Sequence, residues 1–257
     1  MPMRIGNRAI AALCTAALWA AVLLATGATT SRAQSIIAPE QRKAIEEVIR
    51  GYLLDNPEIL VEALDSLQRR RAKAATAAAQ KAIRERRKDL LQDPGSPVSG
   101  RADGDVMMVE FFDYRCGVCR RVHPIIAKLL DADDKIRRVY KEWPILGPNS
   151  VFAARAALAS RRQGKYFAFH DALMEFSGKL TNDEVMERAR RVGIDVARLK
   201  QDMQDPEISA ILRRNFELAK ALKLRGTPSF VIGDELVRGG RDLDTLRQFI
   251  ALARKRG

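Results

Sequence analysis

The chain has 257 residues, of which 47% are hydrophobic and 30% are charged, a composition typical of a globular protein with a sizeable core. Its formal net charge is +13, but residues 69–88 hold nine basic residues against one acid, Glu85, so the excess is local. This distribution argues against nucleic acid as a partner, because the rest of the chain is close to neutral.

The first 33 residues differ from the rest of the chain. Arg4 and Arg8 precede an apolar run over residues 9–25. In Ser31-Arg32-Ala33, small residues occupy the third and the first positions before a cleavage point after Ala33. This pattern predicts a signal peptide over residues 1–33, cleaved near Ala33. An uncleaved anchor is the alternative, although a run of about 17 residues is at the lower limit for spanning a bilayer. We therefore expect export, to a bacterial periplasm.

Two helices are predicted next. Residues 39–54 carry apolar side chains at helical spacing, and Asn56 followed by Pro57 predicts the cap and start of a second helix. The apolar side of the second helix comprises Ile59, Leu60, Ala63, Leu64 and Leu67.

Isolated helices of this size are marginal in water, so their apolar faces need a partner. We interpret residues 34–67 as a helical association module. Residues 68–95 are interpreted as a basic helical linker, solvated because it lacks a comparable apolar stripe. The alternative is that both helices pack on the main domain.

The remaining chain alternates strands and helices. An apolar run over residues 106–112, interrupted by Glu110, suits a buried central strand. A helix containing Pro124 should follow, and four further segments come after it. They are a strand at 136–143, a helical block at 149–224, a strand pair at 228–232 and 236–238, and a final helix at 243–255. The order predicts an α/β domain over residues 96–257.

Cys116 and Cys119 are the two cysteines outside the predicted signal peptide, and they lie between the first strand and the first helix of this domain. A loop this short makes a poor structural disulfide. At a helix N-terminus, the dipole and free N–H groups favour an exposed Cys116 thiolate. Cys119, one turn later, faces the same way and can resolve a mixed disulfide. The pattern predicts a redox-active pair.

Metal binding is a weaker interpretation of the same cysteines. A zinc site usually needs four ligands, and only His123 and His170 could add to the pair, without a usual spacing, so no metal is expected. Copper(I) binding by the two thiolates remains an alternative. His123, one turn beyond Cys119, is a candidate modulating residue, although such histidines are more often structural.

Three sequence motifs resemble the DsbA-like branch of the thioredoxin superfamily over about residues 96–257. They are Phe111-Phe112-Asp113-Tyr114-x-Cys-Gly-x-Cys, Lys141-Glu142-Trp143-Pro144 and Gly226-Thr227-Pro228-Ser229-Phe230. The resemblance implies a thioredoxin fold with a large inserted helical domain at about 149–224, preceded by an N-terminal helical stalk. The two front helices resemble the suppressor-of-copper-sensitivity protein C group, some of whose members are trimeric. A homo-oligomer through residues 36–67, with a trimer favoured, is therefore expected.

The resemblance also implies roles at matching positions. Cys116 would be the nucleophile and Cys119 the resolving thiol. Pro228 would be the cis-proline facing them, and Thr227 would offer backbone hydrogen bonds to a bound peptide. Glu110 falls where the family carries a buried acid that shuttles a proton for the resolving thiol, with Lys141 as its expected partner; a solvent-facing Glu110 is the alternative.

The residues between the cysteines depart from the strong oxidases of the family, which carry Pro-His there. Gly117 and Val118 offer no side-chain charge, so we expect a less depressed Cys116 pKa and a less oxidising disulfide. Thr227 before the proline also resembles the isomerases. The sequence therefore predicts a disulfide isomerase or reductase without a cofactor. It would act on unfolded or misfolded secreted proteins with cysteines and be served by a membrane thiol-redox partner. A disulfide-introducing oxidase and a copper(I)-binding protein are the alternatives.

Overall fold

The structure is a computed structural model that describes residues 38–256, so the signal peptide predicted at 1–33 lies outside the described residues. The chain divides into two compact units, with the boundary between Ser66 and Leu67. Between residues 38 and 256, no helix combines the length and apolar character needed to cross a bilayer.

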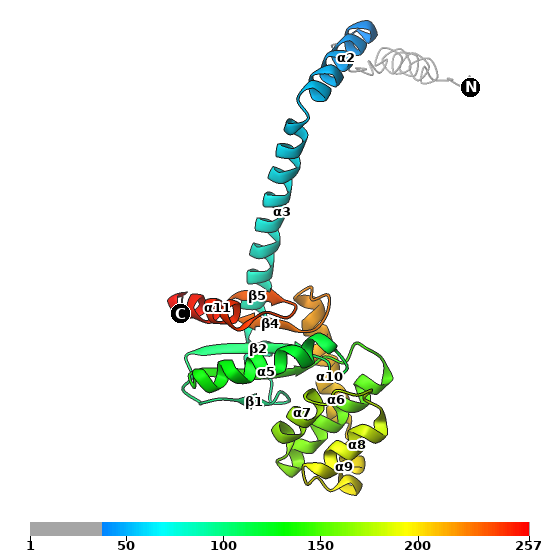
Figure 1. Ribbon diagram of the computed structural model, residues 1–257, viewed down its shortest axis with the longest axis vertical. Helices are drawn as coiled ribbons and strands as arrows, with labels where there is room; N and C mark the ends of the chain where they lie inside the picture. The colour runs from blue at the N-terminus through cyan, green and yellow to red at the C-terminus, as the bar shows by residue number, and fades with distance from the viewer. Residues whose placement is uncertain (1–37, 257) are drawn as a thin grey trace, which may run out of the picture. The chain divides into compact units, whose positions relative to one another are not determined.

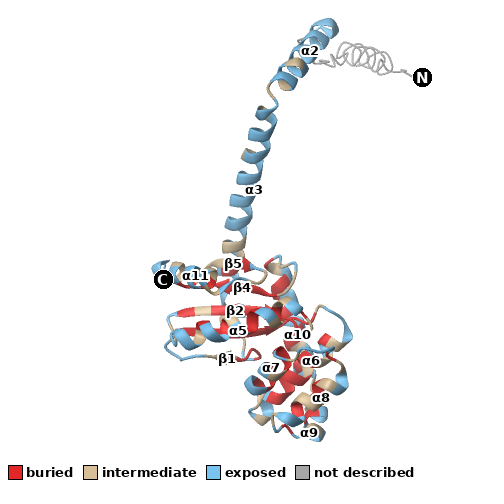
Figure 2. Ribbon diagram, in the orientation of Figure 1, coloured by how far each residue is buried: buried red, intermediate tan, exposed pale blue. Residues whose placement is uncertain are grey.

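The first unit contains helix α2 (Pro39–Asp55) and the start of α3 (Glu58–Glu85), which confirms the two predicted helices. Asn56 acts differently from the prediction: it closes α2, because its backbone N–H and its side-chain Nδ2 each donate to the Tyr52 carbonyl oxygen at 2.9 Å. No residue of α2 is buried, and Val48 is 71% exposed (Figure 2).

Within the second unit, α3 continues to Glu85 and is followed by α4 (Arg87–Leu91). Residues 69–78 are exposed, as expected for a solvated linker. The end of the linker is different, because Ile83 and Leu90 are each 1% exposed and join a hydrophobic cluster of the domain. The expectation that the whole linker is solvated is therefore wrong for this end.

A five-stranded mixed sheet forms the centre of the second unit (Figure 1). Strand β2 is parallel to β3 and antiparallel to β4, and the order across the sheet is β1-β3-β2-β4-β5. The strands are β1 (Val98–Ser99), β2 (Val106–Phe112), β3 (Ile136–Glu142), β4 (Ser229–Ile232) and β5 (Glu235–Arg238). The predicted strands are confirmed, whereas β1 was missed because it is two residues long in a turn-rich segment.

The helices confirm the predicted order. Thr181 and Asp205 cap α8 and α10 by accepting hydrogen bonds from backbone N–H groups. The helices are α5 (Gly117–Ala132), α6 (Pro148–Ser160), α7 (Tyr166–Met174), α8 (Asn182–Arg191), α9 (Val196–Asp202), α10 (Pro206–Ala221) and α11 (Leu243–Arg256), with a short 3₁₀ helix η1 (Arg161–Gln163). The helices α6 to α10 make up the predicted insertion.

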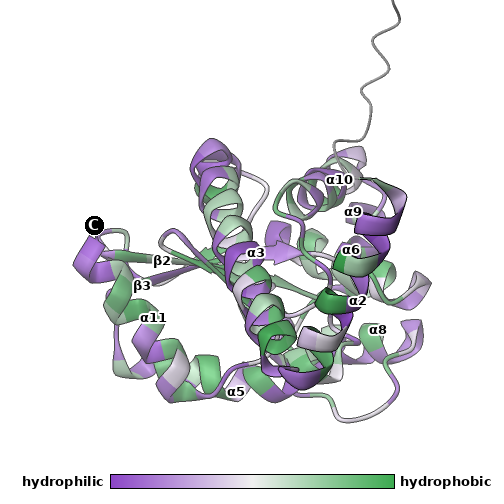
Figure 3. Ribbon diagram, turned by 90° about the horizontal axis from the view of Figure 1, so that it is seen from above, coloured by the Kyte–Doolittle hydropathy of each residue, from purple (hydrophilic) through white to green (hydrophobic). Residues whose placement is uncertain are grey.

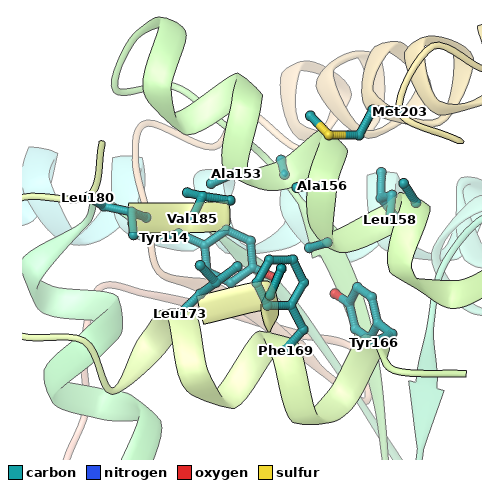
Figure 4. Packing of buried hydrophobic residues seen from close by; sticks show 14 of the residues in the cluster. Tyr114, Ala153, Ala156, Leu158, Tyr166, Phe169, Leu173, Leu180, Val185 and Met203 are labelled. Carbon is teal, nitrogen blue, oxygen red and sulfur yellow. The ribbon is translucent and has the colours of Figure 1, made fainter. Parts of the chain in front are cut away.

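Alternation along β2 sends its side chains to two cores. Val106 and Met108 pack with α5 and α11, whereas Val109 and Phe111 pack with the end of α3, α4 and α10. A third cluster fills the insertion and includes Cys116 and Cys119; Figure 4 shows Tyr114, Tyr166 and Phe169 packed together in it. The cysteine pair therefore lies where the sheet meets the insertion.

Candidate active site

Cys116 is the N-cap residue of α5, which confirms its predicted place at a helix N-terminus. Its sulfur accepts a hydrogen bond from the Cys119 backbone N–H, with 3.4 Å between the nitrogen and Sγ. When it is protonated, the Cys116 sulfur can also donate to the Thr227 carbonyl oxygen, which lies 3.3 Å from Sγ. This contact places the sequence-predicted Thr227, and Pro228 next to it in the chain, beside the nucleophile, and the Thr227–Pro228 peptide bond is cis. Both cysteines are free thiols.

The two thiols differ in exposure. Cys116 is 8% exposed and Cys119 is 1% exposed. The expectation of an exposed Cys116 is therefore only partly met, because the packed insertion covers most of the residue. The difference still decides the order of reaction, since a client disulfide can reach Cys116 before Cys119.

The pKa values of the two thiols move in opposite directions. The pKa of Cys116 is lowered to about 5, first by a hydrogen bond from the Cys119 side chain, and further by the Thr227 side chain and the backbone N–H groups of Cys119 and Val118. Burial opposes this shift. The pKa of Cys119 is raised, first by burial and then by its bond to Cys116. At neutral pH, Cys116 is therefore a thiolate and Cys119 a thiol.

Gly117 and Val118 act through the backbone and through packing. The Val118 side chain packs between two cores and offers no hydrogen bond, as predicted, but its backbone N–H favours the Cys116 thiolate. Gly240 lies against the Val118 side chain, because a Cβ atom at position 240 would come within 2.8 Å of that side chain. The sequence predicts that free N–H groups at this helix N-terminus favour the thiolate, and the Val118 N–H is one of them.

Glu110 is 1% exposed in β2, so the solvent-facing alternative is wrong. Its partner is Arg138 of β3, which donates from Nε at 2.9 Å and also from Nη2. The expected partner, Lys141, instead donates to the Asp89 carbonyl oxygen at 2.8 Å and the Ser96 hydroxyl at 2.7 Å. The correction follows from strand geometry: residues 138 and 141 differ by an odd number and face opposite sides of the sheet.

The Glu110–Arg138 pair bears on the resolving cysteine. The Glu110 charge adds to the effect of burial in raising the pKa of Cys119. Burial is the largest influence on Arg138 and lowers its pKa, but the Glu110 carboxylate together with Tyr140 and Tyr166 raises the pKa of that guanidinium overall. A proton-shuttle role for Glu110 stays a prediction.

His123 is 6% exposed, and its Nε2 lies 3.4 Å from Oδ1 of Asp171. Its ring packs edge-on against His170, with 5.4 Å between the ring centroids. The modulating role proposed for His123 remains a prediction, carried by its place in the helix that begins at Cys116.

A buried polar cluster next to His123 was not anticipated from sequence. Tyr114 and Tyr166 donate from their hydroxyls to Oε1 of Glu142 at 2.7 and 2.8 Å, and His170 Nδ1 lies 3.0 Å from the Tyr114 hydroxyl. Burial raises the pKa of Glu142 to about 8 and lowers the pKa of His170 well below its ordinary value. The sequence signal was weak, because Glu142 follows Lys141 at the end of a strand that already carries charged residues.

Among the described residues, His123, His170 and Asp171 place ligand-type atoms within 4.8 Å of one another. This set is not the combination of two cysteines and two histidines considered from sequence. His170 already engages Tyr114 with Nδ1, and its Nε2 lies 3.5 Å from Arg138. A guanidinium in that position disfavours a cation, so we interpret the cluster as packing.

Asp113 ties the active-site turn to the loop after β3. It is 1% exposed, and its carboxylate accepts hydrogen bonds from the backbone N–H groups of Arg115 at 2.8 Å, Ile145 at 2.8 Å and Leu146 at 3.0 Å. Arg115 returns the contact by donating to the Leu146 carbonyl oxygen at 2.7 Å. Asp113 therefore fixes the turn that presents Cys116, and the Arg115 side chain contacts the loop after β3.

The fold and this cysteine site define a thioredoxin-fold thiol–disulfide oxidoreductase. More specifically, the chain belongs to the family of DSBA-like thioredoxin domains, whose family model matches residues 107–251. A second family model, described as the N-terminal domain of the copper resistance protein ScsC, matches residues 41–74.

Solved structures agree with this assignment. A thioredoxin-like oxidoreductase from Silicibacter pomeroyi DSS-3 is 50% identical, with a TM-score of 0.65, covering 66% of this chain and 98% of that chain. BcfH from Salmonella enterica Typhimurium is 28% identical, with a TM-score of 0.72, covering 84% and 96%. Proteus mirabilis ScsC in a transitional conformation is 28% identical, with a TM-score of 0.63, covering 87% and 99%.

Curated relatives match over part of their length. The chain spans only 24% of a Na(+)/H(+) antiporter NhaA 1 from Salinispora arenicola, to which it is 27% identical over 158 residues, or 61% of this chain. It spans 75% of a protein named "Probable disulfide bond formation protein D" from Bacillus anthracis, with 27% identity over 164 residues, or 59% of this chain.

Proposed function

We propose that the protein rearranges or reduces disulfides in unfolded or misfolded secreted proteins of a bacterial periplasm. The observation that carries the proposal is the placement of Cys116 at the N-terminus of α5, where its sulfur accepts from the Cys119 N–H at 3.4 Å while Cys119 itself is buried. The lowered pKa of Cys116 and the raised pKa of Cys119 agree with it. Such a pair can attack a disulfide at neutral pH and then release the product.

The first step exchanges one disulfide for another. The Cys116 thiolate attacks a client sulfur, a mixed disulfide forms, and the other client sulfur leaves as a thiolate. In isomerisation, a different client thiolate attacks the client sulfur of the mixed disulfide, which returns the Cys116 thiolate without net electron transfer.

In reduction, Cys119 loses its proton and attacks the Cys116 sulfur, releasing the client as a dithiol. The protein then holds the Cys116–Cys119 disulfide, having given two electrons to the client. A membrane thiol-redox partner would supply two electrons to restore both thiols. Glu110, which is buried and acts electrostatically on Cys119, is proposed to take part in moving that proton.

Several sites around one client would favour isomerisation. Apolar side chains on α2 and the start of α3 are exposed, including Tyr52 at 58% and Leu64 at 57%. The match of residues 41–74 to the ScsC N-terminal domain supports a role for this region in self-association, with a trimer favoured.

A disulfide-introducing oxidase is the second candidate. A specific observation favours it: the Cys116 pKa of about 5 is lower than Gly117 and Val118 led us to expect, and a stable thiolate makes the disulfide form more oxidising. Copper(I) binding by the same two thiols is a further alternative, because the family model that matches residues 41–74 is described as a domain of a copper resistance protein.

The deciding experiment compares two refolding assays. Reduced protein should restore activity to scrambled ribonuclease, and a chain without residues 34–66 should do so less well while still reducing insulin. If oxidised protein instead drives disulfide formation in reduced ribonuclease and the scrambled client is not repaired, the oxidase candidate holds. The reduction potential adds to this, since values near about −120 mV mark a strong oxidant and lower values suit rearrangement. Tight copper(I) binding without either activity would favour the third candidate.

A further inference from the structure

The middle of α3 is strongly basic and exposed. Arg69, Arg70, Arg71 and Lys73 follow one another within five positions, and every residue from 69 to 78 is exposed (Figure 2). Figure 3 shows hydrophilic and apolar residues mixed along this helix. The redox chemistry uses none of these side chains, so their concentration in one segment calls for a separate explanation.

Helical geometry gathers most of this charge on one side. Successive residues are turned by about 100°, so Arg69, Arg70, Lys73, Lys81 and Arg84 fall within an arc of about 120°. Arg71 lies outside that arc. We call these five residues the basic stripe. The side chains between them are mainly alanines, which do not cover the charges.

The basic stripe is poorly neutralised within the chain. Among the ion pairs formed by the described residues, none includes Arg69, Arg70 or Lys73. The other two members make long contacts: Lys81 lies 3.8 Å from Glu85, and Arg84 lies 3.8 Å from Asp234. Exposed pairs of this length contribute little, so the stripe keeps its charge.

The side chains of the basic stripe decide between two classes of anionic partner, a protein and a lipid surface. Protein interfaces are usually centred on hot spots in which arginine packs with aromatic or large apolar side chains, and residues 69–78 carry no such partner, only alanine and one threonine beside the cations. A lipid surface needs no such anchor, because clustered long cationic side chains bind anionic headgroups electrostatically. We propose that the basic stripe docks the protein on a membrane leaflet rich in anionic phospholipid.

Docking of this kind would hold the thiol site near a membrane surface. It does not depend on whether the protein isomerises, reduces or oxidises, so vesicle binding can fail while thiol exchange is intact. Each basic residue near an anionic leaflet strengthens binding several-fold, and the attraction is screened by salt.

The test measures co-sedimentation with vesicles of phosphatidylcholine containing about one third phosphatidylglycerol, using protein produced without residues 1–33. The stripe variant combines Arg69→Gln, Arg70→Gln and Lys73→Gln, which preserve helix propensity. The matched control removes the same charge from exposed lysines elsewhere, as Lys128→Gln, Lys179→Gln and Lys200→Gln.

The stripe variant should bind on the order of 100-fold more weakly, whereas the control should bind nearly as well as the original protein. Pure phosphatidylcholine vesicles should bind neither, and raising the salt from about 50 to 300 mM should release the protein. Both variants should reduce insulin at the original rate in solution. Equal losses in the two variants, or no binding to anionic vesicles at low salt, would overturn the proposal, as would capture of the stripe by an acidic protein in place of lipid.

Discussion

Helix α2 and strand β2 both carry apolar runs, but they differ in what covers them. Val106 and Phe111 of β2 are 2% and 0% exposed, because helices of the same chain cover both faces of the sheet. No residue of α2 is buried, and Val48 and Tyr52 are 71% and 58% exposed. An apolar pattern therefore indicates burial only when the chain supplies the covering surface. In α2 it indicates a surface available to another molecule.

The largest effect is expected at the thiol site, in the unit whose apolar strands are covered. Cys116→Ser should abolish insulin reduction and repair of scrambled ribonuclease, because serine does not attack a disulfide at neutral pH. The melting temperature of the variant at pH 7 should fall relative to the reduced protein, because the lowered Cys116 pKa makes the thiolate stabilise the folded state above about pH 5. Full activity in Cys116→Ser would place the reacting thiol elsewhere.

Cys119→Ala should separate attack from release. Client mixed disulfides should accumulate on Cys116, because the resolving thiol is gone. The pKa of Cys116 should also rise above about 5, since the Cys119 side chain is the largest cause of its lowering. Trapped complexes on non-reducing gels and the pH dependence of Cys116 alkylation test the two effects, and an unchanged alkylation midpoint would contradict the second.

Association through the exposed apolar face of α2 is tested by placing charge on that face. Val48→Asp with Tyr52→Asp should shift the mass in solution to that of one chain, because a carboxylate cannot be buried in a helix interface without a large cost. Glu47→Ala, on the opposite side of α2, is the control and should leave the mass unchanged. Isomerase activity should fall with association while insulin reduction persists.

The pair between Glu110 and Arg138 gives a smaller, measurable effect on stability. Glu110→Gln leaves a guanidinium buried without its counter-charge, which should lower the free energy of unfolding by about 3–5 kcal/mol. Urea denaturation measures the loss, and Glu187→Gln, which breaks an exposed pair, should show no comparable change. Similar losses of stability in both variants would mean that the buried Glu110–Arg138 pair stabilises the fold no more than the exposed pair does.

Glu142→Gln should have the smallest effect when stability is compared near pH 5. The pKa of Glu142 is raised from 4.5 to about 8, so the folded state holds a proton that the unfolded state loses above pH 4.5. The original protein should therefore lose stability as pH rises from about 5 through 8. The glutamine variant should differ by less than about 1 kcal/mol near pH 5 and show a flatter profile. Parallel profiles would contradict a protonated Glu142.

The elements that depend on local pattern could be predicted from sequence. The strand at 106–112 coincides with β2 because its run is apolar apart from Glu110, and the helix N-terminus at Cys116 follows from the strand–turn–helix order. The family motifs supplied the insertion and the proline at 228, whose peptide bond is cis.

The parts that depend on partners distant in the chain could not. Arg138 rather than Lys141 meets Glu110 because of the register between β2 and β3. Tyr166 and His170 reach Glu142 and Tyr114 only once α7 packs on the sheet. The low pKa of Cys116 arises largely from hydrogen bonds that residue types alone do not reveal.

The most direct test is the rate of Cys116 alkylation by iodoacetamide between pH 3 and 9 in the reduced protein. The account predicts a midpoint near pH 5 and a rate that no longer rises above about pH 7, with Cys119 unmodified throughout. A midpoint near the ordinary cysteine value of about 8.5 would contradict it, because Cys116 would then be a thiol at neutral pH.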